Sequence, residues 1–222
     1  MNRLAKCLLA LGLALSVHGG AAAQESPSRA IPDDVFYLMP SFSDGMVYFA
    51  GQRPAQGKLN ICAVDNSLRF MDSGGKELSA SDISNVLMVR IDTVTFVHNQ
   101  GMFYRIYPLK DGISLALRRE VKTDQGARKG AYGTTSQTSA IGQKGTLFAD
   151  GIAYSLNTGD VPYRVQEYFF IYKDNSFLPV NKRNLKRAFP GHKEDIDAYF
   201  ASGATIPSTV PELLGILLPW TE

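Results

Sequence analysis

Short apolar segments separated by turn-forming residues constrain the fold of this chain more than any other feature. Residues 68–71 are mostly apolar, and residues 86–91 and 102–107 are rich in β-branched or aromatic side chains. The first is followed by Asp72-Ser73-Gly74-Gly75, where glycine permits the positive φ of a tight hairpin turn. Runs of about four to eight such residues between turns are typical of antiparallel strands. No helix-sized segments alternate with them, which disfavours a parallel α/β fold.

Further strands are expected wherever the same pattern recurs. These expected strands are 35–39, 46–49 (after a turn at 43–45), 94–97, 113–117, 148–149 paired with 152, 163–172 and 177–180. Within 163–172 the alternation places Val165 and Glu167 on one face, and Gln166 and Tyr168 on the other. The predicted fold class is mainly β: an antiparallel sandwich or roll, or an open barrel.

The C-terminal fifth changes to a helical period. Leu185, Ala188 and Phe189 fall at i, i+3 and i+4, and Thr209 with Glu212 has the spacing of a capping box. We therefore expect two or three short helices within 182–218. Helices this short are not stable alone, so they should pack on the sheet or cover one of its edges.

The N-terminus has the organisation of a cleavable export signal. A basic start is followed by the apolar run 7–17 and by the small residues Ala21-Ala22-Ala23. That run is too short to cross a bilayer, which takes roughly 20 residues. We expect a signal peptide at 1–23 cleaved near Ala23, a polar leader at 24–33, and a single β-rich domain at 34–222. The mature protein is expected to be periplasmic or secreted, with no transmembrane segment.

Composition narrows the class of partner. Segment 1–23 holds two of the 23 basic residues and none of the 21 acidic ones, so the mature chain is formally neutral. It lacks the basic field of a general nucleic-acid binder, and no nucleic-acid partner is expected. Only Cys62 remains after cleavage, which excludes an intramolecular disulfide. Cys62 lies in an apolar run and is expected to be buried as a small hydrophobic residue.

Motifs for catalysis or cofactor binding are missing from the sequence. The mature chain keeps only His98, expected in a hairpin turn, and His192, expected at a helix start; both are interpreted as solvated surface residues. There is no Gly-x-Ser-x-Gly elbow, phosphate-binding loop or dinucleotide fingerprint. Two histidines and one cysteine far apart in sequence make a zinc site improbable. We therefore expect no catalytic residues, no metal and no cofactor.

Two alternatives to a binding protein remain open. Glycoside hydrolysis needs only two carboxylates at a defined separation, and Glu120 and Glu167 lie in strand-like runs. That pair is the first to test for a glycan hydrolase, although positions on a polar sheet face explain it more simply. The other alternative is a carrier for an apolar ligand, which requires an unfilled cavity between sheet and helices.

A basic cluster is the strongest local anomaly. The loop expected at 122–145 is rich in Gly, Ser and Thr, and long loops in compact domains are often functional. The candidate binding residues at and near its start are Arg118, Arg119, Arg128, Lys129 and Tyr132, with Lys122 between them. They suit a phosphate, an acidic glycan or an anionic surface, whereas a solvated strand end balanced by Glu120 and Asp124 is the plainer interpretation. The leading hypothesis is a non-enzymatic interaction module with an envelope protein or anionic glycan as partner.

Several short motifs are shared with small exported bacterial proteins. The motifs are Tyr37-Leu38-Met39-Pro40, Gly45-Met46-Val47-Tyr48-Phe49, Lys58-Leu59-Asn60, Lys129-Gly130-Ala131-Tyr132-Gly133, Asn184-Leu185, Phe189-Pro190 and Lys193-Glu194-Asp195-Ile196. On these motifs the chain resembles uncharacterised periplasmic or secreted proteins with a β-rich domain and a helical C-terminal tail. The resemblance implies compartment and architecture, and it contributes no activity and no site residues.

Overall fold

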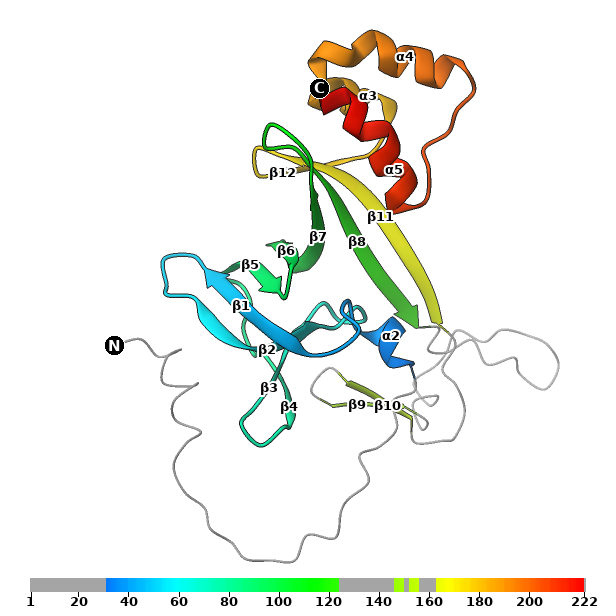
Figure 1. The fold of residues 1–222 in the computed structure, drawn as a ribbon. Coiled ribbons are helices and arrows are strands. Elements are labelled where there is room, and N and C mark those ends of the chain that lie inside the picture. Colours follow the sequence, from blue (N-terminus) through cyan, green and yellow to red (C-terminus); the bar gives the residue numbers. More distant parts are fainter. Residues whose placement is uncertain (1–30, 124–145, 150–151, 156–162, 222) are drawn as a thin grey trace, which may run out of the picture.

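One open antiparallel sheet dominates the computed structural model, which describes residues 31–123, 146–149, 152–155 and 163–221. Ten strands in the described residues form this sheet in the order β12-β11-β8-β7-β6-β5-β1-β2-β3-β4, and β9 and β10 form a separate hairpin (Figure 1). The strands are β1 (Ser43–Phe49), β2 (Ala55–Ile61), β3 (Leu68–Met71), β4 (Glu77–Ser79), β5 (Val86–Ile91), β6 (Val94–Asn99), β7 (Met102–Pro108), β8 (Ser114–Thr123), β9 (Thr146–Ala149), β10 (Ile152–Ser155), β11 (Tyr163–Lys173) and β12 (Ser176–Pro179). The mainly β, antiparallel prediction is confirmed.

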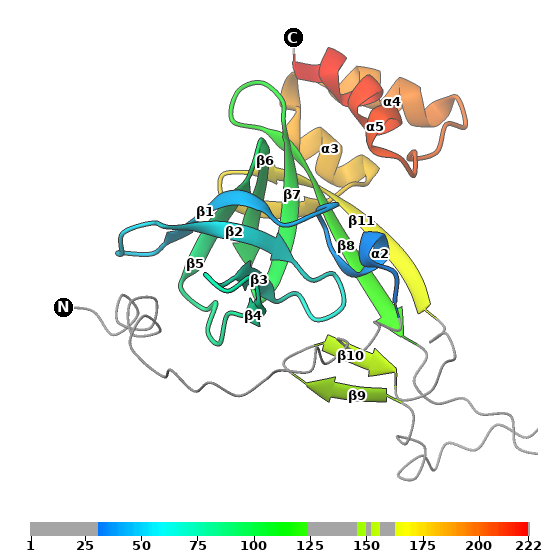
Figure 2. The same cartoon turned by 60° about the horizontal axis from the view of Figure 1, so that its bottom comes forward.

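The sheet curls strongly around its main core (Figure 2). Val47, Val89 and Phe96 lie directly opposite one another on β1, β5 and β6, and all three are buried. Although four strands separate β8 from β2 in the sheet order, the Val121 N–H of β8 donates to the Ala63 carbonyl just after β2, at 3.1 Å. The sheet therefore folds back on itself without closing into a barrel.

The predicted turn at 43–45 is wrong, because β1 runs through it. Gly45 lies opposite both Ile91 of β5 and Gly57 of β2. A Cβ at Gly45 would lie only 2.7 Å from the Arg90 carbonyl oxygen and 2.9 Å from Leu59 Cδ1. This glycine thus permits close approach of neighbouring strands, which is the other common reason for glycine inside a strand.

The predicted strand at 35–39 is also wrong. Residues Asp33–Phe36 form a single helical turn, α2, with both aspartates in the first turn. The Phe36 N–H donates to the Pro32 carbonyl and the Tyr37 N–H to the Asp33 carbonyl. Acidic residues favour a helix N-terminus, and here they outweigh the β propensity of the aromatic run. Only Tyr37 keeps an isolated bridge, with Cys62.

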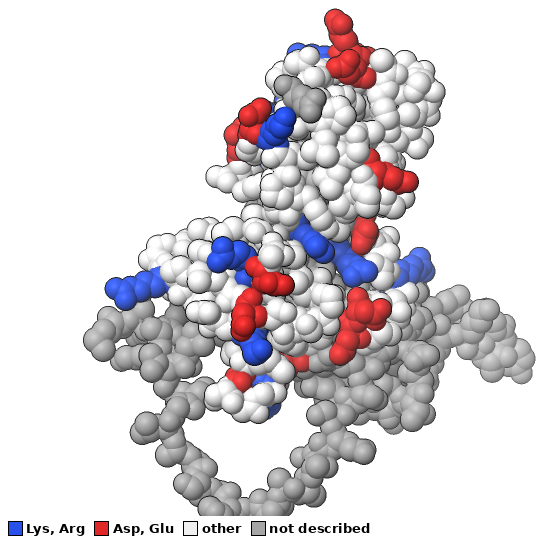
Figure 3. All heavy atoms as spheres, viewed as in Figure 1, with Lys and Arg blue, Asp and Glu red and all other residues white. Residues whose placement is uncertain are grey.

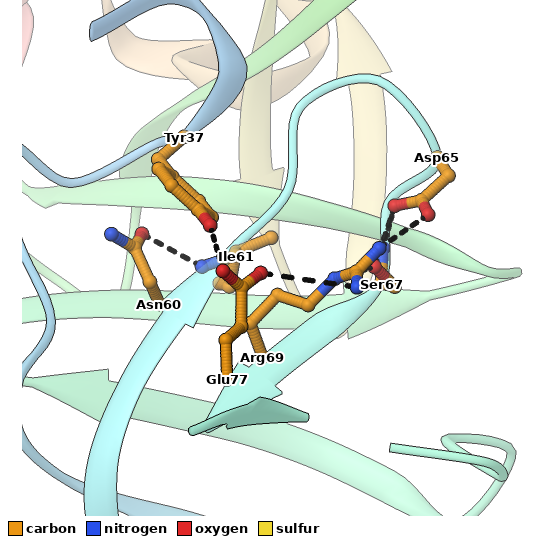
Figure 4. A network of polar contacts seen from close by, with 7 residues as sticks. All are labelled: Tyr37, Asn60, Ile61, Asp65, Ser67, Arg69 and Glu77. Carbon is orange, nitrogen blue, oxygen red and sulfur yellow. Dashed lines mark hydrogen bonds and ion pairs between the residues drawn. The ribbon is translucent and has the colours of Figure 1, made fainter. Parts of the chain in front are cut away.

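Buried polar groups fix this N-terminal segment to the sheet. The Asn60 side-chain oxygen accepts from the backbone N–H groups of Met39 (3.1 Å) and Ile61 (2.8 Å), and its amide donates to the Met39 carbonyl at 3.0 Å. Nearby, the Tyr37 hydroxyl donates to Glu77 at 2.7 Å. Figure 4 shows Arg69 between this carboxylate and Asp65, with its guanidinium 2.8 Å from Asp65 Oδ2. These contacts satisfy polar groups that would otherwise be costly to bury.

The C-terminal helices cover one end of the sheet, as Figure 1 shows. They are α3 (Lys182–Ala188), η3 (Pro190–His192), α4 (Lys193–Ala201), α5 (Val210–Leu217) and η4 (Leu218–Thr221). Leu115 of β8 and Ile171 of β11 meet Leu185, Ile196 and Leu213 in one buried cluster. Thr209 is the N-cap of α5 as predicted, but its hydroxyl donates to the Glu212 carboxylate at 2.7 Å rather than accepting a backbone N–H. The short C-terminal helices are confirmed.

Replacing Asn60 by alanine should destabilise the fold by about 3 kcal/mol, because two backbone N–H groups and one carbonyl lose their partner in a buried site. Urea unfolding followed by circular dichroism measures this change. Asn184→Ala is the matched control, because it removes an amide that donates to the Pro179 carbonyl in an exposed position. Its cost should stay below about 1 kcal/mol, and equal losses in both variants would contradict the role given to Asn60.

Candidate binding surface

Strands β8 and β11 continue together beyond the strands that flank them. β7 pairs with β8 only from Ser114 to Leu117, and β12 pairs with β11 only from Phe170 to Lys173. The β8–β11 ladder itself continues to Thr123 opposite Tyr163. Residues Arg118–Thr123 and Tyr163–Tyr168, here called the arm, therefore form a two-stranded ribbon, which Figures 1 and 2 show running from the helices toward α2.

One strand of the arm is anchored to the rest of the fold. Val121 is buried beside Phe36 and Cys62 and donates its N–H to Ala63. On the same sheet face, the Arg119 guanidinium lies 3.4 Å from the Asp34 carbonyl oxygen and 3.6 Å from Glu167 Oε1. Isolated two-stranded ribbons are marginal in water, so these contacts hold β8 in place and leave β11 as the outer strand.

Basic and aromatic side chains occupy the opposite face of the arm. The Arg118 guanidinium carbon lies 4.6 Å from the centre of the Tyr168 ring, and its Nη2 lies 2.9 Å from Glu120 Oε1. Lys122 lies 3.8 Å from the same carboxylate and stays largely exposed. With Arg164, the arm has four basic side chains and two acidic ones. Figure 3 shows Lys and Arg atoms gathered where β8 and β11 pass between the helices and the lower part of the molecule.

The predicted binding residues are only partly placed by the structure. Arg118 and Arg119 both lie in the arm, but as neighbours along a strand they point to opposite faces, and each contacts a carboxylate. Residues 124–145 of the predicted loop, which include Arg128, Lys129 and Tyr132, lie outside the described residues. The prediction of these three as site residues therefore stays a prediction.

Glu120 and Glu167 do not converge. In the ladder Glu120 lies opposite Gln166, whereas Glu167 lies opposite Arg119. Side chains on directly opposite residues share a face and successive residues alternate, so the two carboxylates lie on opposite faces of the ribbon. Each one is close to an arginine instead. This arrangement does not give the facing pair of acids that glycoside hydrolysis uses.

The outer edge of β11, which no strand in the described part of the chain pairs with from Tyr163 to Tyr168, is the feature that sequence reasoning missed. The Phe169 carbonyl accepts from the Val180 N–H at 3.0 Å, so its backbone groups point away from β8. Because backbone direction alternates along a strand, the groups of Tyr163, Val165 and Glu167 also point outward, where no described strand pairs with them. The signal in the sequence was the length mismatch between an eleven-residue strand and its four-residue hairpin partner.

Other reactive groups in the described residues do not assemble into a site. His98 lies within β6 rather than in the predicted turn; its Nδ1–H donates to the Val86 carbonyl at 2.9 Å, and its ring packs on Phe103. His192 contacts Asp195 on the surface. Among residues whose placement is described, no three His, Cys, Asp or Glu side chains cluster as metal ligands, and no helix there has the length and apolarity to cross a membrane.

Comparison with known proteins adds no relative: no family model, curated protein or solved structure matches this chain.

Cys62 is buried, as the sequence indicated. Burial is the main cause that raises the pKa of its thiol from 9.0 to about 12, and the nearby Asp65 carboxylate is the second.

Since the thiolate is the reactive form, the Cys62 thiol of the native protein should not react with Ellman's reagent at pH 8, and one thiol should be titrated after unfolding in guanidinium. The folded state keeps this proton when the unfolded state has lost it, so the thiol's contribution to stability should decline between pH 9 and about 12. These measurements use the chain without residues 1–23, in which Cys62 is the one cysteine; rapid labelling of its native state would contradict the burial.

Proposed function

We propose that this chain is an exported, non-enzymatic binding module of the bacterial cell envelope, and that the arm holds an anionic partner. The observation that carries the proposal is the arm itself, a ribbon that extends past the rest of the sheet with an exposed outer strand. Residues Tyr163 to Glu167 are all exposed. A ribbon used only for packing would bury one of its faces along both strands, whereas here burial at Val121 is confined to β8.

Charge favours an anionic partner over a neutral one. The arm has two more basic than acidic side chains within a mature chain that is formally neutral, so the positive excess is local. Oriented patches of this kind guide association and select partners more than they add raw affinity. Export follows from the signal-like segment 1–23, and it places the partner in the envelope or outside the cell.

In-cell crosslinking tests this function. The tagged full chain is crosslinked in intact envelope and purified, and its crosslinked partners are identified by mass spectrometry. Lys122→Glu with Arg164→Glu reverses two exposed charges of the arm and should abolish capture of the partner. Arg53→Glu with Lys58→Glu is the matched control, because it makes the same charge change at exposed positions in the β1–β2 hairpin. The control should capture the partner as the unmodified chain does.

Thermal unfolding of both variants excludes loss of fold as the cause. The proposal would be overturned if all three proteins captured the same partner, or if the unmodified chain captured none. If the captured partner is a polysaccharide and not a protein, the proposed function stands and the partner is a glycan.

A further inference from the structure

The geometry points to strand addition at the outer edge of the arm: β11 takes an extended, acidic peptide segment of a partner protein as an additional strand. The space beside residues 163–168, here called the lane, is where that strand would lie. This inference rests on the proposed function and specifies its binding mode.

The lane continues a position that the fold already uses for pairing. β12 occupies the same side of β11 from Phe170 to Lys173. The chain then leaves this position, because Val180 makes the last backbone contact with Phe169 and α3 begins at Lys182. From Tyr163 to Tyr168 the edge has no described partner strand, and a peptide added there would meet outward N–H and C=O groups already held in strand geometry.

The edge lacks several of the features that protect a sheet from added strands. From Tyr163 to Tyr168 it contains no proline, lysine or bulge, and its only charged side chains are Arg164 and Glu167. Two large apolar side chains on it, Tyr163 and Val165, are each 38% exposed. The opposite edge of the same sheet, β4, has only three residues. Among the described strands, a long edge is thus left unpaired on one side of the sheet alone, which favours its use in binding.

The two faces of the edge specify the chemistry of the added strand. Tyr163, Val165 and Glu167 lie on one face, where an apolar neighbour would cover the first two. Arg164, Gln166 and Tyr168 lie on the other face, and across from them on β8 are Arg118, Glu120 and Lys122, so this face has three basic side chains and one acidic one. Since neighbouring strands place like faces together, the matching peptide alternates apolar and acidic residues.

Charge also selects a partner protein over a second copy of this chain. Antiparallel pairing of two copies about a two-fold axis would bring two arms together, each with an excess of two basic side chains. Like charges facing each other across a pair of strands are destabilising. A glycan, in turn, has no regular row of backbone donors and acceptors to match the outward groups of β11.

Fluorescence anisotropy tests the inference. The probe is a capped, fluorescein-labelled peptide of eight alternating Asp and Val residues, and the measurement is its binding to the mature protein. Val165→Pro removes one outward N–H without touching the β8 ladder, since proline is tolerated at an edge; it should weaken binding about tenfold. Val165→Thr, which keeps the N–H, is the matched control and should bind within about threefold of the unmodified protein. An Asp-Val peptide N-methylated at every second backbone nitrogen should also lose about tenfold, which tests the hydrogen bonds without changing the protein.

Several results would overturn strand addition. One is that the Asp-Val peptide shows no saturable binding. Another is that the Val165→Pro variant binds this peptide as tightly as the unmodified protein does, or that the N-methylated peptide binds as tightly as the Asp-Val peptide. A third is that an alternating Lys-Val peptide binds as tightly as the Asp-Val peptide. Sedimentation of a dimer that Val165→Pro dissociates would assign the lane to a second copy instead. If envelope crosslinking depends on Lys122 and Arg164 but not on Val165→Pro, the proposed function stands and strand addition fails; if it depends on none of them, the proposed function itself fails.

Discussion

The pairing of β8 with β11 is the interaction on which the rest of the structure depends. It continues from Ser114 opposite Tyr172 to Thr123 opposite Tyr163, and its two halves have different roles. The first half supplies Leu115 and Ile171 to the cluster that holds the C-terminal helices. The second half has neither β7 nor β12 beside it and becomes the arm. Val121 there donates to Ala63 and connects the arm to the N-terminal segment. One ladder thus fixes the helices, the curl of the sheet and the exposed edge.

Much of the fold could be predicted because its signals are local. Asp-Gly and Gly-Gly turns, alternating apolar residues and the helical period after 182 each depend on a few neighbouring residues. The errors arose where a distant contact decided the outcome. The sequence predicts a turn at Gly45, but the role of this glycine is set by the close approach of Arg90 and Leu59. The sequence also predicts a turn at His98, but β6 continues through this residue, whose ring packs against Phe103.

The candidate site was predicted only in part, for the same reason. Composition led to Arg118 and Arg119, and both lie in the arm. Their opposite orientations, and those of Glu120 and Glu167, follow from the ladder register, which no single segment of sequence encodes. The open edge of β11 depends on where β12 stops and where the chain turns into α3, so it became visible only in the assembled sheet. Arg128, Lys129 and Tyr132 stay predictions, as does an apolar-ligand carrier.

The central claim is that the arm is a two-stranded ribbon whose outer edge is unpaired. Amide hydrogen exchange by NMR along β11 tests it most directly. Arg164, Gln166 and Tyr168 direct their N–H groups toward β8, whereas Tyr163, Val165 and Glu167 direct theirs outward. Exchange should therefore alternate, slow at the first three residues and fast at the other three. Uniform protection would show that the edge is already paired, and uniformly fast exchange would show that the ribbon does not form; either result would contradict the arm as the binding surface.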